Sequence, residues 1–94
     1  MLVHLSVHRP KPGREQELID SMHRFGRGDG GPFPGLREAL TLRDRETGRL
    51  VGITMWDSEE AFRAGVPRMR AAVEGDDFAA WESDRPDVYL LDPV

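Results

Sequence analysis

The chain has 94 residues and a mass of 10.6 kDa, the size of one small domain. Its composition, 38% hydrophobic and 32% charged, is typical of a folded protein rather than a disordered one. The formal net charge is −4, which is unlike the basic character that nucleic-acid binding needs. The absence of cysteine excludes disulfides, thiol catalysis and thiolate-bound metals. No apolar run approaches the roughly 20 residues that span a bilayer, and no signal peptide is recognisable, so we expect a cytoplasmic protein.

The first half of the chain predicts a strand, a helix and a second strand. Residues 1–8 alternate between apolar and polar side chains, the period of a strand. Residues 13–25 carry apolar side chains at helical spacing, and a loop rich in glycine and proline follows over residues 26–35. Residues 36–43 alternate again and predict the second strand.

The second half predicts a strand, a helix, a helical turn and a final strand. Residues 49–56 alternate and follow a turn that ends at Gly48, which indicates a hairpin. Asp57 or Ser58 suits the N-cap of the next helix, and Pro67 predicts a kink or restart within it. A short helical turn over residues 76–82 and a strand over residues 86–92 complete the chain.

This order, β-α-β-β-α-β, predicts an α+β ferredoxin-like domain: one four-stranded antiparallel sheet with two helices on one face, spanning residues 1–94 without a domain boundary. We expect the helices to cover the more apolar sheet face, which carries Val3, Leu5, Val7, Val51, Ile53 and Met55. The other face then carries His4, Ser6, His8, Gly52, Thr54 and Trp56. A chain this short buries too little surface to enclose a large cavity by itself. The semi-polar face therefore predicts a cavity that a second copy of the chain closes.

The segment VGITMWDSEEAFRA, residues 51–64, resembles the third strand and second helix of the antibiotic biosynthesis monooxygenase-like family. The element order and the RPKPG turn after the first strand also fit, so the resemblance covers nearly the whole chain. Members of this family are dimeric α+β barrels, in which two ferredoxin-like sheets pack face to face. The resemblance therefore implies a homodimer and, from the quinone-forming members, a monooxygenase that uses neither metal nor flavin.

The chain matches only part of the residue pattern of those quinone-forming members. Their tryptophan at the strand end corresponds to Trp56. Gly52 replaces their asparagine, and Phe62 replaces their helix tyrosine. Their helix arginine corresponds to Arg70 or to Arg68.

Haem-degrading members show a different pattern, with an asparagine, a helix tryptophan and a helix histidine. This chain contains no asparagine, and Gly65 and Glu74 stand where the tryptophan and the histidine are expected. We therefore reject haem degradation.

The two histidines of the first strand lie four residues, about 13 Å, apart, which is too far for two ligands of one metal ion. We expect His4 to act as a general base or as a hydrogen-bonding group for a ligand, the alternative being a hydrogen-bonded interface histidine. His8 is expected at the rim.

The remaining candidates each have two interpretations. Trp56 is expected to form a wall of the cavity or to anchor the dimer interface, and Tyr89 to point into the cavity or away from it. Arg70, or a hydroxyl group of Ser6 or Thr54, is expected to stabilise a developing oxyanion, although such an arginine is more often part of a solvated helix face.

Two functions follow from these observations. The first is a cofactor-independent monooxygenase-like enzyme, or a related isomerase or cyclase, acting on a small aromatic or polyketide-type ligand. The second is a non-catalytic dimeric module that binds a small molecule or serves as an interaction domain.

Overall fold

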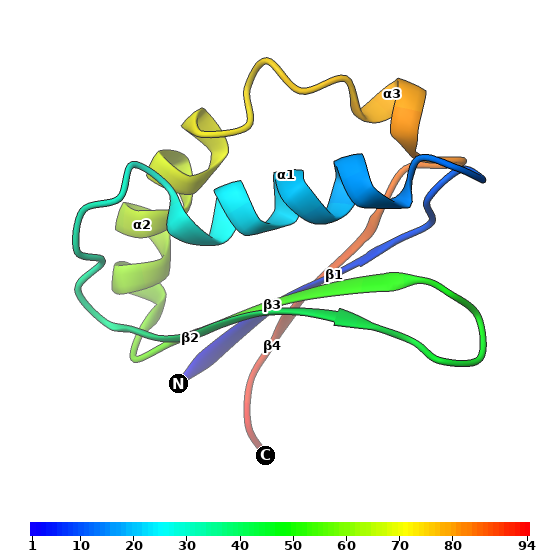
Figure 1. The fold of residues 1–94 in the computed structure, drawn as a ribbon. Helices are drawn as coiled ribbons and strands as arrows, with labels where there is room; N and C mark the ends of the chain where they lie inside the picture. The colour runs from blue at the N-terminus through cyan, green and yellow to red at the C-terminus, as the bar shows by residue number, and fades with distance from the viewer.

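Four antiparallel strands form one layer and two long helices the other (Figure 1). The computed structural model describes residues 1–94. The strands are β1 (Leu2–His8), β2 (Leu36–Arg43), β3 (Leu50–Trp56) and β4 (Asp87–Leu91), and the helices are α1 (Glu15–Arg27), α2 (Glu59–Ala71) and the short α3 (Phe78–Trp81). The strand order β2-β3-β1-β4 gives the predicted ferredoxin-like arrangement. None of the helices is long and apolar enough to cross a membrane.

Helix α2 continues through Pro67 to Ala71, so of the predicted kink or restart the restart does not occur. The Ser58 side chain caps its first turn by accepting a hydrogen bond from the Ala61 amide at 3.1 Å. Val66 and Met69, on either side of Pro67, are both buried. Their packing against the sheet offsets the one backbone hydrogen bond that the proline ring removes.

The prediction of which sheet face meets the helices is wrong. Side chains at directly opposed positions of paired strands point to the same face, so Leu2 shares a face with Trp56, and both are buried under α2. The same face carries His4, Ser6 and His8 of β1 and Leu50, Gly52 and Thr54 of β3. Alternation separates two faces but does not say which one the helices cover.

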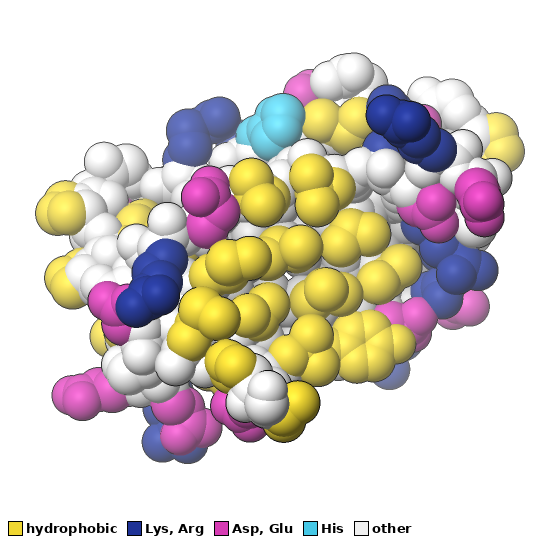
Figure 2. Space-filling model, turned by 90° about the horizontal axis from the view of Figure 1, so that it is seen from below, with side chains coloured by type: hydrophobic (Ala, Val, Ile, Leu, Met, Phe, Trp, Pro, Cys, Tyr) yellow, Lys and Arg dark blue, Asp and Glu magenta, His cyan; other side chains and the backbone are white.

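The other face carries the apolar residues and is left uncovered. Figure 2 shows hydrophobic side chains crowded over this side of the sheet. The strand register places these residues together: Val3, Leu5, Val7, Leu40, Leu42, Val51, Ile53, Met55, Tyr89 and Leu91. Because so much apolar surface lies outside, only 11 of the 94 residues are buried.

The compact core lies under α2, at one end of the sheet. Trp56 and Met69 are fully buried there, with Leu2 and Val66 packed beside them. Gly65 allows the close approach of helix and strand, because a Cβ atom on it would lie 2.3 Å from Cη2 of Trp56. Away from this end, smaller sheet residues leave space beneath the helices.

Candidate functional site

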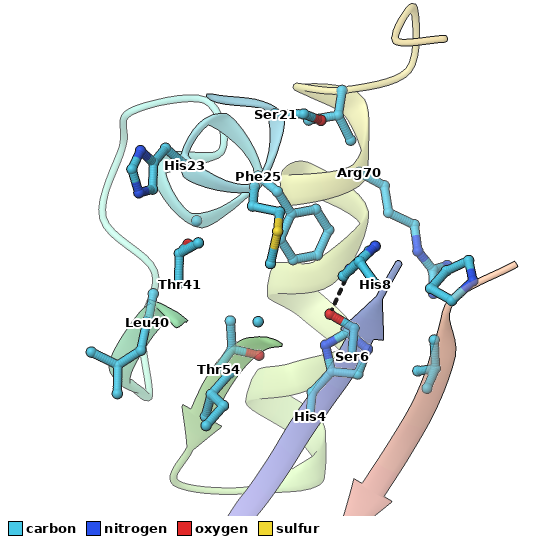
Figure 3. A pocket seen from close by; sticks show the side chains of 18 of the residues that line it. His4, Ser6, His8, Ser21, His23, Phe25, Leu40, Thr41, Thr54 and Arg70 are labelled. Atoms are coloured by element: carbon cyan, nitrogen blue, oxygen red, sulfur yellow. Dashed lines mark hydrogen bonds between the residues drawn. The ribbon is translucent and has the colours of Figure 1, made fainter. Parts of the chain in front are cut away.

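A cavity of about 600 Å³ lies between the sheet and the helices (Figure 3). This volume is within the range of small-molecule sites. Its lining comes from β1, β2, β3, both long helices, α3 and the start of β4, all within one chain. The expectation of a cavity between two copies is therefore wrong, as a consequence of the inverted sheet face.

Small side chains on the sheet create this space. Ser6 on β1 lies opposite Gly52 on β3, and both line the cavity. A Cβ atom on Gly52 would lie 2.9 Å from Oγ of Ser6 and 3.3 Å from Cε of Met22. The predicted site residue Gly52 thus acts through its missing side chain, which leaves room for Ser6 and for the cavity.

His4 supplies a basic group in a mainly apolar part of the cavity. Its ring lies 5.4 Å from that of Phe62 and 6.4 Å from that of Phe25, between centroids. Burial of the imidazole, and secondarily the charge of Arg70, lower the pKa of His4 below its usual 6.5. The ring is therefore neutral at pH 7, a state in which one nitrogen accepts a proton.

The structure separates the two candidate arginines of α2. Arg70 lines the cavity and extends from the end of the helix toward its strand side (Figure 3). Arg68 does not reach it: its guanidinium donates to both carboxylate oxygens of Asp29, at 2.6 and 2.7 Å, and to the Pro32 carbonyl at 2.9 Å. Of these two arginines, Arg70 is therefore the one available to a ligand.

Trp56 neither forms a wall of the cavity nor lies exposed to anchor a dimer interface, the two roles expected from the sequence. Its side chain is fully buried in the single chain and does not line the cavity. Its indole Nε1 donates to Oγ1 of Thr54 at 2.9 Å. Thr54 does line the cavity, so Trp56 holds a site residue in place.

The last two predicted residues also lie outside the lining. Tyr89 pairs with Leu5 on the uncovered face and is 47% exposed there, so it points away from the cavity. Phe62 stands behind His4 and meets the Trp56 ring edge-on, at 6.2 Å between centroids.

One buried residue, Glu82, was missed by the sequence analysis, and His8 was misjudged as a rim residue. Nδ1 of His8 lies 2.6 Å from Oε1 of Glu82, and its Nε2 lies 2.9 Å from Oγ of Ser6. The Glu82 side chain is 5% exposed. No local sequence signal marks this contact, because an isolated bridge between Pro10 and Glu82 forms it across the fold. No group of three or more histidine and acidic side chains is arranged to hold a metal ion.

No protein-family model matches the sequence, and the search of curated proteins finds no match. Solved structures are similar along nearly the whole chain. Rv0793 from Mycobacterium tuberculosis is 16% identical, with a TM-score of 0.79 over 99% of this chain and 94% of its own. PA3566 from Pseudomonas aeruginosa is 14% identical, with a TM-score of 0.76 over 99% of this chain and 93% of its own. A protein named antibiotic biosynthesis monooxygenase is 18% identical, with a TM-score of 0.76 over 100% of this chain and 99% of its own. The chain therefore shares its fold, from end to end, with proteins that include an antibiotic biosynthesis monooxygenase.

Proposed function

We propose that this protein is a cofactor-independent monooxygenase of the antibiotic biosynthesis kind, acting on a small phenolic aromatic ligand. The observation that carries the proposal is a neutral imidazole, His4, facing a mainly apolar cavity that an arginine also lines. The fold shared with a protein named antibiotic biosynthesis monooxygenase, and the WDSEEAF segment at residues 56–62, support the same reaction class.

The first task of such a site is to ionise the phenol. His4 has a lowered pKa and is a weaker base than a free histidine, so it needs a second group to stabilise the phenolate that forms when it accepts the proton. Arg70 compensates, because its fixed positive charge favours the phenolate as the proton moves to the imidazole. A phenolate donates electrons to dioxygen far more readily than the neutral phenol does.

The walls of the cavity suit a flat apolar ring. Met22 and Phe25 of α1 line it above the sheet, and Val73 lines it beyond the end of α2. Thr54 brings a hydroxyl group whose oxygen already accepts from Trp56, so its hydrogen is free to donate to the ligand. These groups bind and orient, while His4 moves the proton.

A hydroxyanthrone is a suitable test substrate, because its oxidation has a defined balance. Its CH₂ carbon becomes a carbonyl, one oxygen atom of O₂ enters the product quinone, and the other leaves as water. We expect oxygen uptake matched by quinone absorbance. His4→Phe and Arg70→Gln should each lower kcat/KM by about a hundredfold or more, the usual scale of a lost general base or of a lost group that stabilises an oxyanion.

Arg63→Gln is the matched control, because Arg63 lies on the same helix but pairs with Glu59 on its exposed side. This variant should oxidise the substrate at the wild-type rate. Saturable binding of the anthrone without oxygen uptake would overturn the enzyme proposal and favour the non-catalytic binding module. Equal rates in His4→Phe and wild type would remove His4 from the mechanism.

We also propose that the partner of this protein is a second copy of the chain, bound through the uncovered sheet face. The contiguous apolar surface in Figure 2 supports this proposal, as does the dimeric state that the family resemblance implies.

A further inference from the structure

Ser6, His8 and Glu82 form a continuous hydrogen-bonded chain at the cavity wall. Oγ of Ser6 lies 2.9 Å from Nε2 of His8, and Nδ1 of His8 lies 2.6 Å from Oε1 of Glu82. Ser6 and His8 stand two residues apart on β1 and therefore on one sheet face, and both line the cavity. Figure 3 shows the Ser6–His8 contact among the side chains that line the cavity.

For a neutral His8 ring beside an ionised Glu82, the two contacts allow one arrangement of the hydrogens. An ionised Glu82 carboxylate can only accept, so the hydrogen of the ring lies on Nδ1 of His8. Nε2 of the neutral ring is then an acceptor, and the Ser6 hydroxyl donates to it. This is the relation of nucleophile, base and orienting carboxylate found in serine hydrolases.

The surroundings leave Ser6 accessible and supply a positive charge. Gly52, directly across the sheet, has no side chain to cover the hydroxyl group. Arg70 lines the same cavity and provides the charge needed by an oxyanion that forms on an acyl carbon near Ser6. The apolar walls accept the acyl group.

We propose that Ser6 is a nucleophile toward small apolar carboxylic esters, with His8 as its base and Glu82 as the residue that positions His8. Oγ of Ser6 forms a bond to the ester carbonyl carbon while its proton moves to Nε2 of His8. The bond to the leaving oxygen breaks, and the leaving alcohol takes that proton. Water then attacks the acyl-serine with His8 as base, which releases the carboxylic acid and restores Ser6.

This activity is separate from the proposed oxidation, because it needs neither dioxygen nor His4. His4→Phe should therefore retain ester cleavage while it loses anthrone oxidation. Failure of one reaction leaves the other measurable.

The test combines turnover of p-nitrophenyl acetate with covalent labelling by a fluorophosphonate, followed by mass mapping of the adduct. We expect the label on Ser6 in wild-type protein, and esterase rates at least about tenfold lower in Ser6→Ala and His8→Ala. Added imidazole should restore part of the His8→Ala rate, which a purely structural role of His8 would not produce. Glu82→Gln should also lower the rate, because its amide donates to Nδ1 and moves the ring hydrogen to Nε2.

Two serines serve as controls. Ser21 lines the same cavity but donates to Asp76 at 2.6 Å and has no imidazole partner, so it should carry no label. Ser83→Ala removes an exposed serine beside Glu82 and should leave the rate unchanged. Wild-type protein whose Ser6 stays unlabelled while other serines react, or Ser6→Ala with the wild-type rate, overturns the proposal. The labelling of wild-type protein gives this answer even if a variant does not fold.

Discussion

The charge state of His4 links the cavity to the stability of the fold. Burial, with a smaller contribution from Arg70, lowers the pKa of His4 below 6.5, so the folded protein takes up this proton less readily than the unfolded chain. Stability is therefore lost as the pH falls from about 6.5 toward the pKa of the folded state. In His4→Phe, whose ring meets Phe25 and Phe62 without titrating, the urea midpoint should fall less between about pH 7.5 and pH 5 than in wild type.

The same measurement separates His4 from the carboxylates. Hydrogen bonds from Arg68 to Asp29, from Thr47 to Asp44 and from Ser21 to Asp76 lower the pKa values of these three groups below 3.8. Their contributions are present above about pH 4 and are lost only in stronger acid. Equal loss of stability above pH 4 in wild type and His4→Phe would contradict a neutral, buried His4.

Gly65 shows at residue scale how the core excludes a side chain. The Trp56 ring occupies the space that a side chain on Gly65 would need, because a Cβ atom there would lie 2.3 Å from Cη2 of Trp56. Gly65→Ala should lower the free energy of unfolding by up to about 2 kcal/mol, since overpacking costs roughly 1–3 kcal/mol and the gain in helix propensity returns about 1 kcal/mol. Urea unfolding measures this, with Gly75→Ala as control because no atom lies within 4 Å of its added Cβ. An unchanged midpoint in Gly65→Ala would mean that the ring moves freely.

Among the elements, helix α2 holds the glycine-rich loop through Arg68. The Arg68 guanidinium lies 4.1 Å from the centroid of the Phe33 ring and donates to Asp29 and to the Pro32 carbonyl. Hydrogen bonds from Arg68, and then from the Gly31 amide, lower the pKa of Asp29 to about 2. Arg68→Gln should therefore speed amide hydrogen exchange across residues 29–33 while exchange in the sheet is unchanged. Equal acceleration in Arg63→Gln would show that the effect is not due to this contact.

The elements themselves were largely readable from the sequence, and their relative placement was not. The periodicity gave the full extent of β2 and most of both long helices, because period 2 and period 3.6 are local properties. Alternation also grouped His4 with Ser6 and Thr54, but it is symmetric between the faces, so the side covered by helices was assigned wrongly. Glu82 and His8 are 74 residues apart, and only the tertiary fold brings them together.

At the scale of the whole molecule, the helices cover one side of a thin structure and leave the other side apolar. The extents are 36 × 31 × 17 Å, and Leu40, Leu42, Tyr89 and Leu91 on the uncovered face are 37–47% exposed. Monomeric proteins rarely expose so continuous an apolar surface. We expect sedimentation equilibrium to give twice the 10.6 kDa chain mass.

Leu42→Lys tests this dimer, because it places a charge within the apolar face at a residue that is already 44% exposed in the single chain and does not line the cavity. Burying that unpaired charge between two sheets costs several kcal/mol, so the variant should sediment as a monomer. Gln16→Lys, on the exposed side of α1, should remain dimeric. Since the cavity lies within one chain, on the helix side of the sheet, and Leu42 does not line it, monomeric Leu42→Lys should still bind the anthrone. Loss of binding together with loss of the dimer would instead indicate that a second copy completes the cavity, and a wild-type mass of one chain would contradict the interface itself.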